Sequence, residues 1–141
     1  MKLPWDDPQS LYGVRHLAQK WQDDGTAKKI KAFLLEDMVG DADLNIDRVL
    51  EGTPWVEDLI YQAAVNVGYQ SHFFARQMSV VDDFKPFLER GVPSADLIDL
   101  NYGYNNVFHH TTQDTVDKLS PKSLGIVGTV TLETVRLLNQ R

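Results

Sequence analysis

The chain has 141 residues, of which 43% are hydrophobic and 24% are charged, values typical of one soluble globular domain. Its net charge is −6 and no run of lysine or arginine stands out, so no nucleic-acid partner is expected. No segment approaches the ~18 apolar residues of a membrane span, and residues 1–8 lack the apolar stretch of a signal peptide. The absence of cysteine excludes disulfides and thiolate ligands without identifying the compartment, so a zinc site would have to use histidines and carboxylates.

Hydrophobic spacing and turn residues predict, in chain order, a helix at 10–23, a strand at 30–35, a loop at 41–52, a helix at 53–68, a short strand at 72–74, a short helix at 84–90, a strand at 95–100, a loop at 101–106 and a helix at 120–139. Thr53 and Ser120 each precede a proline, which is a strong helix start. The last helix is apolar over a wide arc and is expected to be largely buried. Because helices and strands alternate, the predicted fold class is α/β, with helices on both faces of a central mixed sheet in three layers.

Pairs of carboxylates lie beside two of these elements. Glu36 and Asp37 follow a predicted buried strand, and α/β sheets commonly place their sites at this end of their strands. The alternative is a strand end that turns into solvent. Asp82 and Asp83 precede the short helix, where paired aspartates are more often helix caps than catalytic groups.

Residues 107–120 form a polar stretch that is rich in His, Thr and Asp and lacks helical spacing. A pair of imidazoles on such a loop, here His109 and His110, is able to hold a metal ion, although loop histidines are more often surface residues. Tyr102 and Tyr104 precede this stretch and are consistent with lining a pocket or with covering the core.

Four segments carry distinctive motifs, in the order Gln9-Ser-Leu-Tyr-Gly-Val-Arg-His-Leu17, Leu34-Leu-Glu-Asp-Met-Val-Gly40, Val81-Asp-Asp-Phe-Lys-Pro-Phe-Leu-Glu-Arg-Gly-Val-Pro93 and Phe108-His-His-Thr-Thr-Gln-Asp-Thr-Val-Asp-Lys118. In order and spacing they resemble segments of the zinc-dependent family-28 metallopeptidases, which include bacterial aminopeptidases and glutaminyl cyclases. The resemblance covers nearly the whole chain. It implies the C-terminal part of a catalytic domain with the phosphorylase/hydrolase-like zinc aminopeptidase fold.

The resemblance also implies roles for individual polar residues. His110 corresponds to a zinc ligand. Asp37 corresponds to a zinc ligand in two-zinc aminopeptidases and to a hydrogen-bonding site residue in one-zinc cyclases. Asp83 corresponds to an active-site aspartate that positions catalytic groups, and Asp114 to a residue that orients the histidine-bearing loop. His109 stands where the family has tryptophan, and it either adds a nitrogen to the site or replaces part of its wall.

Part of the family's catalytic set has no counterpart in this sequence. The other zinc ligands and the acidic general base lie ahead of the segment that resembles residues 9–17. Asp6 and Asp7 form an acidic pair, but similar aspartates follow the true pair in relatives, so they are not expected to replace it. A catalytic zinc needs about three protein ligands. The spare donors are His109, Asp83, Glu36 and Asp99.

Three functions are therefore open. The leading hypothesis is a zinc metallopeptidase-like domain of the aminopeptidase family, with a peptide substrate, whose isolated chain is weakly active or inactive. The alternatives are a glutaminyl cyclase-like acyltransferase and a non-catalytic, self-associating remnant of the fold. Zinc is the implied cofactor, although two ligands would hold it weakly. Loss of the strands that the missing part would supply leaves an unpaired sheet edge, which favours homo-oligomers.

Overall fold

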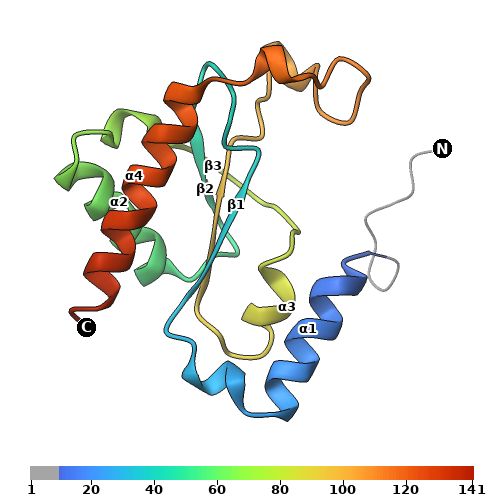
Figure 1. Ribbon diagram of the computed structural model, residues 1–141, viewed down its shortest axis with the longest axis vertical. Helices are drawn as coiled ribbons and strands as arrows, with labels where there is room; N and C mark the ends of the chain where they lie inside the picture. The colour runs from blue at the N-terminus through green and yellow to red at the C-terminus, as the bar shows by residue number, and fades with distance from the viewer. Residues whose placement is uncertain (1–9) are drawn as a thin grey trace.

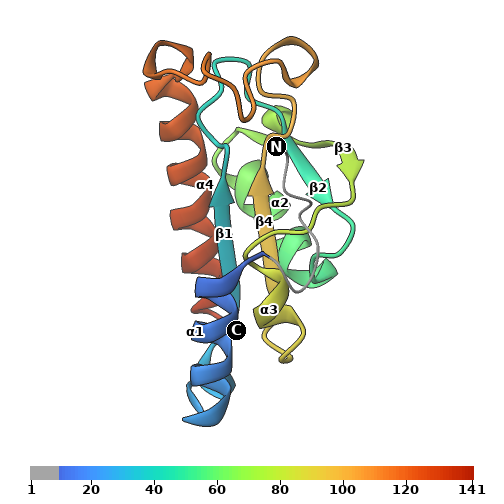
Figure 2. The ribbon, with the colours of Figure 1, turned by 90° about the vertical axis from the view of Figure 1, so that its right-hand side faces the viewer.

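The computed structural model describes residues 10–141, so Asp6 and Asp7 lie outside the described part of the chain. The helices are α1 Tyr12–Asp23, α2 Pro54–Asn66, α3 Lys85–Leu88 and α4 Pro121–Leu138, and the strands are β1 Phe33–Asp37, β2 Ile46–Val49, β3 Phe73–Met78 and β4 Ser94–Ile98. Helices α2 and α4 cover one face of the sheet and α1 and α3 lie on the other (Figures 1 and 2). The predicted α/β class is confirmed. Within the described range, no helix is long and apolar enough to cross a membrane.

The strands form a mixed sheet in the order β1-β4-β2-β3. Strands β1 and β4 are parallel, with Phe33 opposite Ser94 and Asp37 opposite Ile98. Strand β2 runs antiparallel to β4 and parallel to β3. The carboxyl ends of β1 and β4 therefore lie next to each other at the same end of the sheet, where loops are able to bring functional side chains together.

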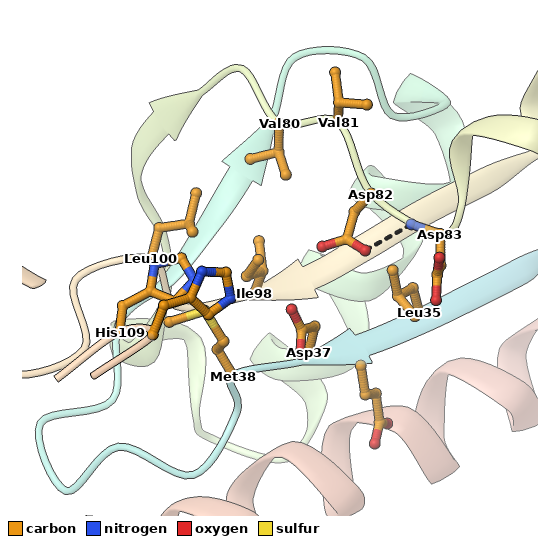
Figure 3. A pocket seen from close by; sticks show the side chains of 12 residues that line it. Leu35, Asp37, Met38, Val80, Val81, Asp82, Asp83, Ile98, Leu100 and His109 are labelled. Carbon is orange, nitrogen blue, oxygen red and sulfur yellow. Dashed lines mark hydrogen bonds between the residues drawn. The ribbon is translucent and has the colours of Figure 1, made fainter. Parts of the chain in front are cut away.

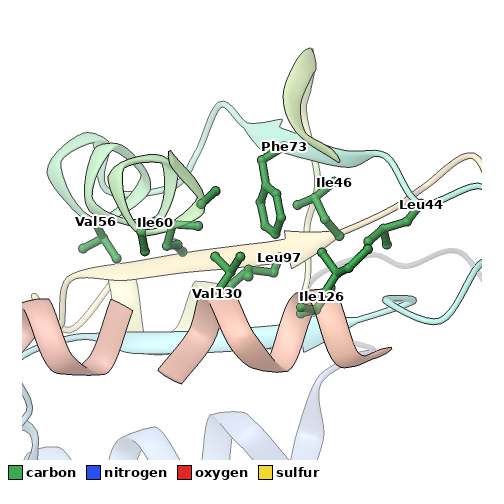
Figure 4. Close-up of a cluster of buried hydrophobic side chains, with 12 residues drawn as sticks. Leu44, Ile46, Val56, Ile60, Phe73, Leu97, Ile126 and Val130 are labelled. Carbon is green, nitrogen blue, oxygen red and sulfur yellow. The ribbon is translucent and has the colours of Figure 1, made fainter. Parts of the chain in front are cut away.

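Two hydrophobic clusters hold the layers together. The larger lies between α2, α4 and the sheet (Figure 4), with Leu44, Ile46, Val56, Ile60, Phe73, Leu97, Ile126, Val127 and Val130 among its buried members. On the opposite face, Phe87 packs among residues of α1 and β1. The two helix starts at Pro54 and Pro121 lie within one residue of their predicted positions.

Several other boundaries differ from the predictions. The predicted loop at 41–52 contains β2, the strand expected at 30–35 begins at Phe33 and reaches Asp37, the strand expected at 72–74 extends to Met78, and the short helix ends at Leu88. Strand β2 escapes the hydrophobic pattern because its Asp47 is buried in an ion pair with Arg76 of β3. A tertiary partner therefore permits a charged residue where the pattern requires an apolar one.

Ser120 caps α4, because its side-chain oxygen accepts a hydrogen bond from the Ser123 backbone N–H at 3.3 Å. We expect Ser120→Ala to lower the free energy of unfolding by about 1 kcal/mol, measured by urea denaturation. Ser120→Asp keeps the acceptor and is the matched control. Thr53 stands at the same position of α2 but accepts from the Ser94 backbone N–H instead, so the result for α4 would not transfer to Thr53. An unchanged midpoint in Ser120→Ala would contradict the capping role.

Candidate functional site

Two adjoining cavities, of about 550 Å³ and 290 Å³, lie at the carboxyl ends of β1 and β4. The residues that line both cavities are Asp37, Met38, His109 and His110. The larger cavity is also lined by Asp82 and Asp83, and the smaller by Asp41, Tyr102 and Asp114. The predicted residues Asp37, Asp83, His109, His110 and Asp114 thus gather in one region from three separate segments.

Glu36 and Asp37 at the end of β1 point to opposite faces of the sheet, because successive side chains of a strand alternate in direction. Asp37 lies in the cavity beside Leu35 (Figure 3). Glu36 also lines the larger cavity, but its carboxylate accepts a hydrogen bond from Thr131 of α4. Glu36 is therefore engaged with the opposite layer. Met38 then takes a left-handed backbone conformation, with φ of 53°, and turns the chain at the cavity rim.

Four aspartates form an acidic cluster at the larger cavity: Asp37, Asp82 and Asp83, which line it, and the buried Asp96. Asp37 and Asp82 point towards one another (Figure 3), and Asp82 Oδ1 accepts the Asp83 backbone N–H at 2.6 Å. Burial, with the charges of Asp37 and Asp83, raises the pKa of Asp82. Such a group is suited to holding a proton closer to neutral pH than an ordinary aspartate.

Asp96 lies at the middle of β4, completely buried, and neither carboxylate oxygen has a hydrogen-bond partner among the described residues. Burial first, and then the charges of Asp82, Asp37 and Asp83, raises the pKa of Asp96 to about 8. The sequence analysis did not single out Asp96, and it interpreted Asp82 as part of a helix-capping pair. The available signal for Asp96 was a carboxylate inside an otherwise apolar strand, and for Asp82 it was the adjacent Asp83.

The histidine-bearing loop has a defined conformation. The His109 ring lies 3.9 Å from the His110 ring, and His109 Nδ1 is 3.0 Å from Asn106 Nδ2. His110 has a positive φ of 57°, which is uncommon for residues other than glycine. Upstream, Gly103 also has a positive φ, and a Cβ there would lie 2.5 Å from the Phe108 ring. The close turn before the histidines therefore requires glycine.

Hydrogen bonds connect this loop to the strand ends. Tyr102 donates from its hydroxyl to Asp114 at 2.8 Å, and burial together with this bond raises the pKa of Tyr102 to about 12. Asp41, which follows β1, accepts from the Gly103 backbone N–H at 3.1 Å. Asp114 therefore joins the segment that carries the histidines to Tyr102 in the loop after β4.

Asp99, one of the spare donors, is held by hydrogen bonds and an ion pair that join parts of the fold. Its carboxylate accepts the backbone N–H groups of Asn45 and Asn101 and lies 3.2 Å from Arg76 Nη2. Burial raises the pKa of Asp99 despite these partners. Asp99 therefore ties the loops after β1 and β4 to strand β3 and does not line either cavity.

The metal donors of residues 10–141 do not complete a zinc site. Among them, no group of three or more His, Asp or Glu side chains is placed to hold a metal ion. His110 and Asp37 share both cavities, but two donors fall short of the about three that a catalytic zinc requires. The described residues fit part of such a site.

A family model described as Peptidase family M28 matches residues 8–135. The chain belongs to peptidase family M28. This M28 sequence is 31% identical over 114 residues to the glutaminyl-peptide cyclotransferase of Drosophila melanogaster, covering 67% of this chain and 32% of that protein. The family resemblance inferred from the four motifs is thereby confirmed.

Solved structures agree with this membership. A crystal structure of Acidobacteriales bacterium glutaminyl cyclase is 53% identical, with a TM-score of 0.94, over 97% of this M28 chain and 48% of that chain. A Zn-dependent exopeptidase from Parabacteroides distasonis is 18% identical, with a TM-score of 0.78, over 100% of this chain and 49% of that chain. The second likeness shows the fold alone. The chain thus spans about half the length of these structures.

Proposed function

We propose that this chain is one part of a glutaminyl cyclase-type catalytic site that acts on peptides with an N-terminal glutamine. The observation that carries the proposal is the likeness to Acidobacteriales bacterium glutaminyl cyclase, at 53% identity over 97% of this chain. Aminopeptidase activity, the leading hypothesis from the sequence, has weaker support. The exopeptidase and leucine aminopeptidase structures are 18% and 22% identical.

Cyclisation of a glutaminyl peptide joins the α-amino nitrogen to the side-chain carboxamide carbon and releases ammonia. The nitrogen loses a proton and the leaving amine gains one, so the site needs a group that moves a proton between them. Two carboxyls of the acidic cluster, Asp82 and Asp96, have a raised pKa. Asp82 lines the cavity, so it is the one able to hold a proton where a substrate would bind.

In a one-zinc cyclase site, His110 is the residue of this chain that would hold zinc, and Asp37 would stand beside it as a hydrogen-bonding residue. A zinc ion would polarise the carboxamide carbonyl, but one donor does not fix it. We therefore assign no step to zinc within this chain. The isolated 141-residue protein is expected to bind less than one zinc per chain and to show little or no turnover.

A chimera tests this function, with this chain replacing the matched half of Acidobacteriales bacterium glutaminyl cyclase. We expect the chimera to bind zinc and to release ammonia from a glutaminyl peptide. Mutation of a residue that only hydrogen-bonds to a zinc-coordinating side chain typically lowers zinc affinity by roughly 10–100-fold. His110→Ala should lower zinc affinity by more than this. Zinc is measured by elemental analysis and ammonia by a coupled assay. Thr112→Ala, an exposed change on the same loop, is the matched control.

The alternative activities predict other outcomes. A folded, zinc-loaded chimera that removes leucine from a leucyl peptide and releases no ammonia would favour the aminopeptidase. A folded chimera that binds no zinc would favour the non-catalytic remnant.

A further inference from the structure

The region where the two cavities adjoin holds a soft metal donor besides the histidines and carboxylates described above. Four residues line both cavities; two of them are histidines and one, Met38, carries a thioether sulfur. The chain contains no cysteine, so a thioether is the softest donor that it offers. Thioether and imidazole groups together suit Cu(I), whereas zinc is ordinarily held by imidazole, thiolate and carboxylate groups. A donor set that includes methionine therefore favours copper over zinc.

The position of Met38 is not explained by packing alone. Part of its side chain packs on the hydrophobic cluster that contains Phe84 and Ile98, but the residue is half-buried and lines both cavities. Its backbone is left-handed, with φ of 53°, a conformation that is uncommon for a residue other than glycine. In Figure 3 its side chain extends to the same part of the cavity as the His109 ring. A side chain that served only the core would need no access to either cavity.

The two imidazoles lie against one another. The His109 and His110 ring centroids are 3.9 Å apart, with an angle of 50° between the ring planes. Neighbouring residues of an extended chain point in opposite directions, so adjacent histidines do not ordinarily bring their rings together. The left-handed backbone of His110, with φ of 57°, turns the chain and does so here. The loop therefore offers two nitrogen donors to one ion.

Asn106 supports the His109 ring as a metal donor. Its side-chain nitrogen lies 3.0 Å from His109 Nδ1, and its side-chain oxygen is buried with no hydrogen-bond partner among residues 10–141. A half-turn of the amide exchanges the two atoms, and the oxygen then accepts a hydrogen bond from the Nδ1–H. Metal-bound histidines typically donate their second N–H to such an acceptor. This arrangement directs His109 to bind a metal through Nε2.

His109 also separates this donor set from the one that the family resemblance implies. The resemblance assigns zinc to His110 and places tryptophan at position 109, and an indole has no lone pair with which to bind a metal. It gives Met38 no metal either. The imidazole of His109 and the sulfur of Met38 are therefore two donors in addition to the implied zinc ligand.

We propose that His109, His110 and Met38 form a Cu(I) site, in which two imidazole nitrogens and one thioether sulfur surround the ion. Cu(I) is held by a few soft donors, whereas zinc requires a fuller tetrahedral set. Because His110 is also the implied zinc ligand, copper and zinc exclude one another at this residue. The copper site requires neither a substrate nor turnover, so it does not depend on the proposed cyclase activity.

The test is titration of the 141-residue protein with Cu(I) under anaerobic conditions, with ascorbate as reductant and bicinchoninate as competing chelator. We expect each chain to take one Cu(I) from the chelator, and an equal concentration of Zn²⁺ not to displace it. X-ray absorption at the copper edge should show a sulfur neighbour. That sulfur neighbour should be absent in Met38→Leu.

Matched variants identify the donors. Met38→Leu nearly conserves side-chain volume, and His109→Trp introduces the residue that the family resemblance places there. Each should weaken Cu(I) binding by more than about tenfold, the lower end of the effect of losing a group that only supports a metal ligand. Met78→Leu, at the end of β3, and His16→Ala, exposed on α1, are the controls and should bind Cu(I) as the native chain does. Circular dichroism verifies that each variant is folded.

Three results would overturn the proposal. The first is a folded chain that takes no Cu(I) from the chelator or loses it to an equal concentration of Zn²⁺. The second is equal weakening in the donor variants and in the controls. The third is copper without a sulfur neighbour that Met38→Leu binds as tightly as the native chain. A chimera that binds zinc but has no cyclase activity would remove the proposed function and leave the copper site standing.

Discussion

Phe87→Ala should lower the free energy of unfolding by about 3–5 kcal/mol. Phe87 is 1% exposed. Its ring stacks on Phe33 of β1 at 4.4 Å and lies tilted against Trp21 of α1 at 5.4 Å between centroids. The side chain therefore joins α1, α3 and the sheet. Because α3 is one short turn, few neighbouring side chains are able to move into the space that the ring leaves.

Urea denaturation followed by circular dichroism measures this loss. Tyr104→Ala removes an aromatic ring that is 84% exposed and should change stability by less than about 0.5 kcal/mol. If the two variants have equal midpoints, the α1–α3 layer contributes little to folding and the second hydrophobic cluster is not cooperative with the sheet.

Asp96→Asn should stabilise the protein at alkaline pH and remove a large part of its pH dependence. The pKa of Asp96 is raised from 3.8 to about 8 by burial and by the neighbouring aspartates. Between these values the unfolded chain releases the proton and the folded chain keeps it. The free energy of unfolding therefore falls as the pH rises, by about 1.4 kcal/mol per pH unit. Below pH 3.8 both states are protonated and the contribution is fully retained.

The measurement is urea unfolding at pH 5.5 and at pH 7.5, chosen within that window. The native chain should lose about 3 kcal/mol from this group between the two, whereas Asp96→Asn, which is neutral at both, should not. Asp43→Asn, at an exposed position, is the control and should keep the native slope. A slope unchanged in Asp96→Asn would mean that Asp96 is ionised in the folded chain.

Local sequence signals predicted the helices that have a strong start. Thr53 and Ser120, each followed by proline, placed α2 and α4 within one residue or so of their observed bounds. Strand β2 was missed because Asp47 is buried against Arg76, a partner 29 residues away. A pattern of single residues contains no information about such a pairing.

The sequence predicted some of the site residues, but it did not single out Asp96 and interpreted Asp82 as part of a helix-capping pair. The motifs led to Asp37, Asp83 and His110, which do line one cavity. Asp82 and Asp96 acquire their environment only when β4 and the segment before α3 meet, so no local rule separates them from a helix cap or a strand end. Their raised pKa values are properties of the folded cluster.

The last helix shows the same limit on its apolar side. Its wide apolar arc predicted burial, and the prediction is wrong for Leu124 and Val135, which are exposed. Hydrophobic spacing shows that a face should be covered, but it does not identify the segment that covers it.

The position of β4 has a consequence for synthesis on the ribosome. Strand β4 occupies the interior of the sheet between β1 and β2, yet it is the last of these strands to be translated. Within the described residues, the segment at Phe33–Asp37 must therefore wait for Ser94–Ile98 before its strand partner is made. At typical elongation rates this wait lasts roughly 3–12 seconds. During that time β2, α2 and β3 are able to associate locally, while the nascent β1 segment remains without its β4 partner.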